Sequence, residues 1–318
     1  MSEPVLVYGS DHSPWVQTVL LALEHRCVPY QIVQFPISIS SYLKHGMVMP
    51  VCRWPDGHII TDSFAILAEI DKRHSESGIS LLVPPEDPSI VASDQSRLEL
   101  FFLLYVLARF EWGNKGRFVH VWAKTAPQHP SPFLIFLSHA FRATMTLYFI
   151  LLIQGGIWSQ TRKRKAIYKK DLFLKEWSRW CGRLGDSPFF GGDTPHYLDF
   201  ALLGQIQCIS SGLTDEVFSA LRQEPAMMHW LERMHTYLPN YPRMYSKRFF
   251  SNGFTPTQTS VWGIIVFYMS LILQFALAPL PIVFLLHAFS LRNRNPARTM
   301  GKLQRPTQTS LGDSHPAG

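Results

Sequence analysis

The stretch Gly9–Trp15 constrains this chain most, because it joins an apolar run to a helical pattern through a short turn. The run Pro4–Tyr8 is typical of a buried strand, and the apolar residues of Val16–Leu23 recur at helical spacing. Ser13 stands where a helix N-cap belongs, and Pro14 stands at the first helical position. The free N–H groups of such a helix end favour a bound anion, for example a thiolate.

Strands and helices continue to alternate after this first helix. Tyr30–Phe35 alternates apolar and polar residues, which predicts a second strand. Val48–Trp54 and His58–Ile60 flank the turn Pro55–Gly57, and an Asp-Gly turn between short strands predicts a hairpin. Apolar residues in Phe64–Ile70 again have helical spacing. The expected order is therefore βαβ followed by ββα.

This order, with a proline at the start of the third strand, resembles the thioredoxin-like domain of glutathione transferases. The residues that carry the resemblance are Ser13-Pro14, Met49-Pro50-Val51, and Asp62-Ser63 leading into Phe64–Leu67. The resemblance implies an α/β thioredoxin-like N-terminal domain, an all-α helical C-terminal domain, glutathione as co-substrate, and a homodimer.

A domain boundary is expected within Ser77–Pro88, which holds prolines and polar residues. The glutathione-binding domain then covers residues 1–76 and the all-α transferase domain covers 77–250. Within the second domain, Phe133–Ile153 is an apolar run that looks like an addition to the family pattern. Arg142 makes this run a poor membrane span, so a buried or amphipathic helix over the substrate region is expected.

The block Ser187–Leu202 resembles the start of the central buried helix of the transferase all-α domain. Family members carry an aspartate at the position of Asp199, where it closes the helix N-terminus from inside the first turn. The family's capping serine or threonine falls at His196 in this chain. We therefore expect Thr194, which precedes Pro195, to cap the helix instead.

The C-terminal region is expected to hold a membrane helix within residues 251–291, followed by a disordered basic tail over 292–318. The chain has a mean hydropathy of +0.03, which is high for a purely soluble protein. Val261–Phe289 is almost continuously apolar and would form a helix of about 43 Å. That length exceeds a hydrocarbon core of roughly 30 Å, so Pro279 and Pro281 are expected to kink a single-pass anchor.

Charge and cysteine content narrow the classes of partner. The net charge is +7, and basic residues cluster at Arg162–Lys165 and between Arg292 and Arg305. No nucleic-acid-binding module accompanies them, so a lipid bilayer is the expected partner. The 4 cysteines are scattered without metal-ligand spacing, and no signal peptide is evident. We therefore expect no metal and no nucleic acid, with the transferase domains facing the cytoplasm.

The resemblance also assigns residues to the parts of glutathione. Asp62 and Ser63 would hold the γ-glutamyl end, although either could serve only as a helix N-cap. Pro50 would be cis and would expose the backbone of Met49 to the cysteinyl unit; a trans proline at a strand start is the alternative. Lys44, or the histidine that follows it, could meet the glycine carboxylate.

Ser13 corresponds to the catalytic serine of the serine-type transferase classes. Its hydroxyl would donate a hydrogen bond to the thiolate of glutathione and lower the pKa of that thiol. Tyr8 is a second candidate donor, although such a tyrosine more often packs. His12 is expected to face solvent.

Two functions from different classes follow. The first is a membrane-anchored glutathione transferase, which would conjugate glutathione to small hydrophobic electrophiles in detoxification. The alternative is a non-enzymatic membrane adaptor resembling metaxins or ganglioside-induced differentiation-associated proteins. An ion channel is less favoured, because the apolar segment follows the folded domains.

Overall fold

The computed structural model describes residues 3–33, 49–74, 88–109, 170–210, 221–250 and 259–277, and parts of 119–151 and 279–290. Its first part confirms the predicted order of strands and helices and is a thioredoxin-like α/β unit. The elements are β1 (Val5–Tyr8), α1 (Pro14–His25), β2 (Tyr30–Val33), β3 (Val51–Arg53), β4 (Ile59–Thr61) and α3 (Ser63–Arg73).

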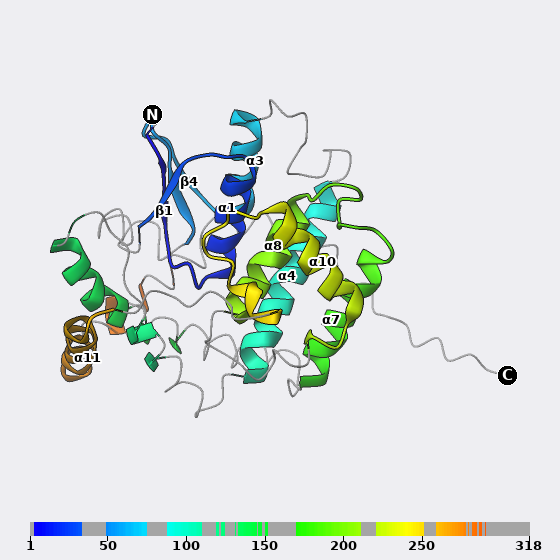
Figure 1. Ribbon diagram of the computed structural model, residues 1–318. Coiled ribbons are helices and arrows are strands. Elements are labelled where there is room, and N and C mark those ends of the chain that lie inside the picture. The colour runs from blue at the N-terminus through cyan, green and yellow to red at the C-terminus, as the bar shows by residue number, and fades with distance from the viewer. Residues whose placement is uncertain are drawn as a thin grey trace.

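The strands form one sheet in the order β2-β1-β3-β4. β1 runs parallel to β2 and antiparallel to β3, which is antiparallel to β4. The hairpin turn closes as predicted: the His58 N–H donates to Asp56 Oδ1 at 2.9 Å. Gly57 has φ +83°, a conformation that a side chain would strain. Helices α1 and α3 lie together beside the sheet (Figure 1).

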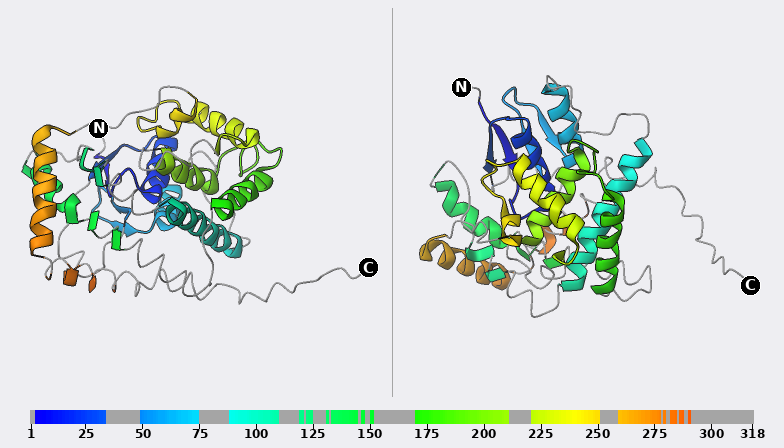
Figure 2. Two further views of the ribbon diagram at one scale, coloured as in Figure 1. Left: turned by 90° about the horizontal axis from the view of Figure 1, so that it is seen from below. Right: turned by 45° about the vertical axis from the view of Figure 1, so that its right-hand side comes forward.

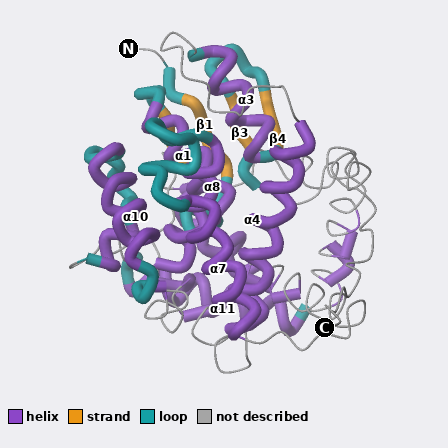
Figure 3. Tube along the Cα trace, turned by 90° about the vertical axis from the view of Figure 1, so that its right-hand side faces the viewer, coloured by secondary structure: helices purple, strands orange, loops and turns teal. Residues whose placement is uncertain are grey.

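The rest of the described chain is mostly helical (Figure 3). Its elements are α4 (Pro88–Arg109), α7 (Lys170–Leu184), α8 (Tyr197–Cys208), α10 (Pro225–Tyr237), the 3₁₀ helix η3 (Tyr245–Phe249) and α11 (Val261–Ala276). The expected boundaries at residues 76, 250 and 291 stay predictions, because residues 75–87, 251–258 and 291–318 lie outside the described part.

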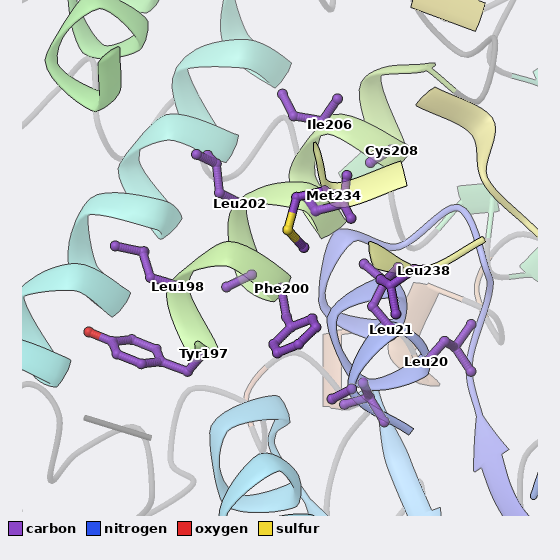
Figure 4. Close-up of a cluster of buried hydrophobic side chains, with 14 of the residues drawn as sticks. Leu20, Leu21, Tyr197, Leu198, Phe200, Leu202, Ile206, Cys208, Met234 and Leu238 are labelled. Atoms are coloured by element: carbon purple, nitrogen blue, oxygen red, sulfur yellow. The ribbon is translucent and has the colours of Figure 1, made fainter. Parts of the chain in front are cut away.

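Helix α8 is the centre of the hydrophobic core, since every one of its residues is buried. Phe200 of α8 lies toward Leu20 and Leu21 of α1, whereas Leu202 points toward α4 (Figure 4). Gly204 allows the two helices to approach: a Cβ there would lie 2.5 Å from the Pro14 carbonyl oxygen. This contact seats the helical region directly against the first turn of α1.

Replacing Gly204 by alanine is therefore expected to destabilise the protein by about 1–3 kcal/mol, because the added Cβ forces α8 away from α1. Thermal unfolding followed by circular dichroism measures the loss. Gly182 of α7 is the matched control, since a Cβ there meets nothing within 4 Å. Gly182→Ala should leave stability unchanged or raise it by up to about 1 kcal/mol. Equal effects of the two variants would contradict the close α1–α8 packing.

The N-terminus of α8 differs from the expected capping. His196, not Thr194, occupies the N-cap position. The Asp199 carboxylate closes the helix end as expected and accepts from the N–H groups of Phe190, Gly191 and His196 at 2.9, 3.2 and 3.0 Å. It also accepts from the indole N–H of Trp230 at 2.8 Å. With so many donors on one buried carboxylate, a hydroxyl at Thr194 is not needed as the cap.

The C-terminal apolar segment also differs from its prediction. The expected helix over Val261–Phe289 is interrupted, because α11 ends at Ala276 and described residues are helical again at 279 and from 282 on. Pro279 and Pro281 follow closely, and proline disfavours helical backbone at the residue before it and removes a helix N–H. The interruption thus lies next to the prolines, where the sequence predicted a kink. Among the described residues, the structure contains no helix that is both long and apolar enough to cross a bilayer.

Candidate functional site

Three segments that the sequence singles out meet at one edge of the sheet. Tyr8, the last residue of β1, pairs with Val51, and Val51 pairs with Thr61 at the end of β4. The segments that extend beyond this row are Gly9–Ser13, Met49-Pro50 and Asp62-Ser63. Antiparallel pairing places the end of β1 and the start of β3 at the same edge, so these segments converge.

Gly9 determines how closely the first two segments approach. Its φ is +151°, and a Cβ at this position would lie 2.6 Å from Val16 Cγ2 and 3.3 Å from Met49 Cβ. Any side chain would therefore push Met49 away from the turn. The Met49–Pro50 peptide bond is cis, as expected from the sequence.

Ser13 is the N-cap residue of α1, with extended backbone at φ −81° and ψ 129°. Its carbonyl oxygen accepts the first helical hydrogen bond from the Gln17 N–H at 2.9 Å. Its hydroxyl, however, makes no capping hydrogen bond to the helix. Ser13 is half-buried. Its hydroxyl therefore lies at the positive end of the α1 dipole and does not cap the helix.

Asp62 and Ser63 divide the roles at the start of α3. Asp62 Oδ1 accepts from the N–H groups of Phe64 and Ala65 at 3.0 and 3.3 Å, so Asp62 is the N-cap. Its φ of +83° is a strained value for a non-glycine residue, and such strain often occurs at ligand sites. Ser63 is 5% exposed. The Trp15 and Phe64 rings lie 6.5 Å apart, so the N-termini of α1 and α3 are neighbours.

Residues Lys44 and His45 lie outside the described part of the chain. Their expected place beside the glycine carboxylate of glutathione stays a prediction. Tyr8 is half-buried at the end of β1. In the described residues, no group of three or more His, Cys, Asp or Glu side chains is arranged to hold a metal ion.

The expectation that His12 faces solvent is wrong, because His12 is 4% exposed. Its ring stacks on Tyr245 with centroids 5.6 Å apart and lies 6.0 Å from the ring of Trp122. Trp122 in turn accepts a hydrogen bond from Arg142 through its carbonyl oxygen. These partners lie more than one hundred residues away in sequence, so the local pattern around His12 could not reveal them.

Asp11 ties the same turn to the segment after α10. Its Oδ2 accepts from the Tyr245 hydroxyl at 2.9 Å and lies 3.5 Å from Arg243 Nε. Gln17 donates to the Asp11 carbonyl oxygen at 2.6 Å and accepts from the Tyr241 hydroxyl at 2.6 Å. The turn that contains Ser13 is thus fixed by contacts with the segment after α10, which the sequence analysis did not predict. Burial and the nearby Asp11 carboxylate raise the pKa of the Tyr245 hydroxyl, which keeps it a donor.

Buried histidines predict how stability depends on pH. Burial lowers the pKa of His12, and it lowers the pKa values of His25, His139 and His235 to about 4. An unfolded histidine titrates near pH 6.5, so the unfolded chain binds more protons than the folded one between pH 6.5 and 4. Stability should therefore hold above pH 6.5 and fall as the pH decreases through this window.

Urea unfolding at pH 7.5 and pH 5 measures this dependence. His235→Asn should weaken the dependence on pH, because it removes one of the histidines whose pKa is lowered. His229 of α10 is exposed, and His229→Asn should leave the dependence unchanged. A wild-type protein that is equally stable at both pH values would contradict the neutral buried state of these rings.

Comparison with known protein families matches one domain of this chain. The family model described as "Glutathione S-transferase, N-terminal domain" matches residues 12–73. This range includes Ser13, Met49, Pro50, Asp62 and Ser63. The chain has no match among curated proteins.

Solved structures show low sequence identity to the chain. A glutathione S-transferase of Ceriporiopsis subvermispora in complex with glutathione is 16% identical, covers 75% of this chain and 98% of its own, and has a TM-score of 0.48. A glutathione transferase of Bombyx mori is 16% identical, with coverage of 78% and 96% and a TM-score of 0.44. A glutathione S-transferase from Rhodospirillum rubrum is 15% identical, with coverage of 82% and 99% and a TM-score of 0.41.

The matched range contains α1, β2, β3, β4 and α3 of the α/β unit and begins after β1. The match agrees with the resemblance noted from the sequence. Over residues 12–73, this chain is therefore similar to the N-terminal domain of the glutathione S-transferase family.

Proposed function

We propose that this protein is a serine-type glutathione transferase. The observation that carries the proposal is the Ser13 hydroxyl, which stands at the N-terminus of α1 but does not cap it. It lies at the sheet edge where the cis Met49–Pro50 bond and the start of α3 also lie. The match of residues 12–73 to the family's N-terminal domain supports the same function.

Each converging segment would hold one part of glutathione. The N–H and hydroxyl of Ser63, at the N-terminus of α3, suit the carboxylate of the γ-glutamyl unit. Both capping bonds of Asp62 end on Oδ1, so Oδ2 is left for the ammonium group of that unit. The backbone of Met49 would pair with the cysteinyl unit like an added strand. Lys44 would meet the glycine carboxylate.

Ser13 would act on the thiol. Its hydroxyl donates a hydrogen bond to the sulfur, which stabilises the thiolate over the thiol and releases the thiol proton to solvent. The helix N-terminus adds a positive partial charge at the same point. The thiolate then attacks an electrophilic carbon, and a carbon–sulfur bond forms as the leaving group departs with its electron pair. We propose that the electrophile is small and hydrophobic, because the half-buried Trp15 borders Ser13.

Calorimetric titration of the full chain with glutathione tests this function. We expect saturable binding that Ser63→Ala weakens by about tenfold or more, since a hydrogen bond to a charged group is lost. Ser178 of α7 is exposed, and Ser178→Ala is the matched control that should bind like the wild type. Failure of the wild type to bind glutathione would overturn the proposal.

The alternative is the non-enzymatic adaptor. It is favoured by the burial of Ser63, which at 5% exposure has little surface for a ligand. Under this alternative Asp62 and Ser63 only shape the start of α3, and titration with glutathione gives no heat of binding. The homodimer that the resemblance implies is a prediction under either function, and sedimentation velocity measures it.

A further inference from the structure

Large apolar side chains lie exposed on α11 and on the neighbouring helical residues 133–144. We call this set the apolar face. Its members and their exposed fractions are Phe133 69%, Phe136 53%, Val261 74%, Trp262 70%, Ile265 43%, Met269 61%, Ile272 61%, Leu273 58% and Phe275 63%. Contiguous exposed apolar surface of this kind marks a site for a protein or a membrane.

In the helical residues 133–144, the polar side chains face the protein interior and the apolar ones face outward. Ser138, His139 and Arg142 are buried at 0%, 4% and 3% exposure, whereas Phe133 and Phe136 are exposed. A surface helix in water shows the reverse arrangement. Polar side chains that face the protein while apolar ones face outward are typical of helices in contact with lipid.

The inner side of α11 is fixed to these helical residues along its length. The Thr259 hydroxyl lies 3.3 Å from His139 Nε2, and a Cβ on Gly263 would lie 2.6 Å from the same ring. Phe267 is fully buried, and Gln274 reaches the carbonyl oxygen of Ala140 at 3.5 Å. Figure 2 shows α11 at the edge of the molecule, away from α7 and α10. Within the described part of the chain, the outward side of α11 is therefore the side that is open to a partner.

Charge distribution identifies the kind of partner. The sequence from Phe249 to Leu291 contains no Lys, Arg, Asp or Glu. Basic residues follow directly, at Arg292, Arg294, Arg298, Lys302 and Arg305. An apolar surface next to a basic segment suits an anionic bilayer, whose interior accepts the apolar side chains while its headgroups attract the basic ones.

We propose that the apolar face docks on an anionic bilayer surface, with α11 lying in the plane of the interface. Its outward side chains enter the lipid, and its inner side stays packed on the helical residues 133–144. The protein is then bound to one side of the membrane and α11 does not cross it. This proposal requires no glutathione chemistry and stands apart from the proposed function.

Flotation with vesicles tests the proposal. The full chain is mixed with vesicles of phosphatidylcholine and phosphatidylserine, or of phosphatidylcholine alone. We expect flotation with both, tighter with phosphatidylserine, and release by alkaline carbonate. The double variant Met269→Glu, Ile272→Glu should bind about tenfold more weakly or worse, because two carboxylates would enter the lipid. Both residues are 61% exposed, so the fold should tolerate the changes.

The matched control is the double variant Ile59→Glu, Ile90→Glu, which makes the same change in charge at exposed residues of β4 and α4. It should float like the wild type. Brominated lipids should quench the tryptophan fluorescence of the wild type more than that of Trp262→Phe. This difference would place Trp262 in the bilayer.

Three results would each overturn the proposal: no flotation, equal loss of flotation in both double variants, or retention after carbonate with the C-terminal tail protected from protease. Absence of flotation together with a dimer that Met269→Glu, Ile272→Glu dissociates would assign the apolar face to a second copy.

Discussion

Replacing Ser13 by alanine is expected to lower the rate of glutathione conjugation by about 10- to 100-fold, while glutathione binding changes little. Under the proposed function the hydroxyl lost is a donor to the thiolate, and a hydrogen bond to a charged group is worth about 1.5–3 kcal/mol. The same loss should raise the pKa of bound glutathione by about one to two units. Initial rates with a chromogenic electrophile, measured between pH 6 and 9, report both effects.

Tyr8→Phe is the control for this prediction, because Tyr8, the last residue of β1, is the second candidate donor. It should keep the wild-type rate and pH profile. If Tyr8→Phe loses activity and Ser13→Ala does not, the thiolate donor is Tyr8 and the role given to Ser13 is wrong. Calorimetry on both variants separates a loss of binding from a loss of chemistry.

Replacing Asp199 by alanine is expected to reduce the free energy of unfolding by about 3–5 kcal/mol. Asp199 is fully buried, and its carboxylate accepts from backbone N–H groups at the start of α8 and from the Trp230 indole. Its removal leaves those buried donors without an acceptor, which costs about 1–3 kcal/mol for each group that stays unsatisfied. The midpoint of thermal unfolding should fall by about 10 °C.

Asp193→Ala is the matched control, since Asp193 is exposed in the loop that precedes α8. Its midpoint should lie within about 1–2 °C of the wild type, as is usual for a surface change. An equally small shift for Asp199→Ala would show that water replaces the carboxylate at the start of α8. Circular dichroism at a slow scan rate gives both values.

Local signals were enough to predict the α/β unit. Pro14 and the Asp56-Gly57 turn act through backbone conformation within a few residues, so the first helix and the hairpin follow directly from the sequence. The cis bond before Pro50 was implied by the resemblance to glutathione transferases. The candidate site was placed by the same resemblance, whose residues fall at the ends of these elements.

Distant contacts account for the wrong predictions about His12 and about the cap of α8. His12 is buried because Trp122 and Tyr245 cover it, and neither residue is near it in the sequence. His196 and not Thr194 is the N-cap of α8, because the Asp199 carboxylate accepts hydrogen bonds from the preceding loop and from α10. No pattern within a short window contains such information.

The sequence by itself determined which segments of the α/β unit become strands and helices, and that Ser13, Met49-Pro50 and Asp62-Ser63 lie at their ends. These properties depend on the periodicity of apolar residues and on backbone preferences, which are local. Only the tertiary structure decided which side chains are covered. In the tertiary structure His12 and Arg142 are buried, and the outward side of α11 is exposed. Hydropathy shows that the α11 segment is apolar but not which of its side chains are exposed. Burial is a property of packing between distant elements, so it could not be deduced from composition along the chain.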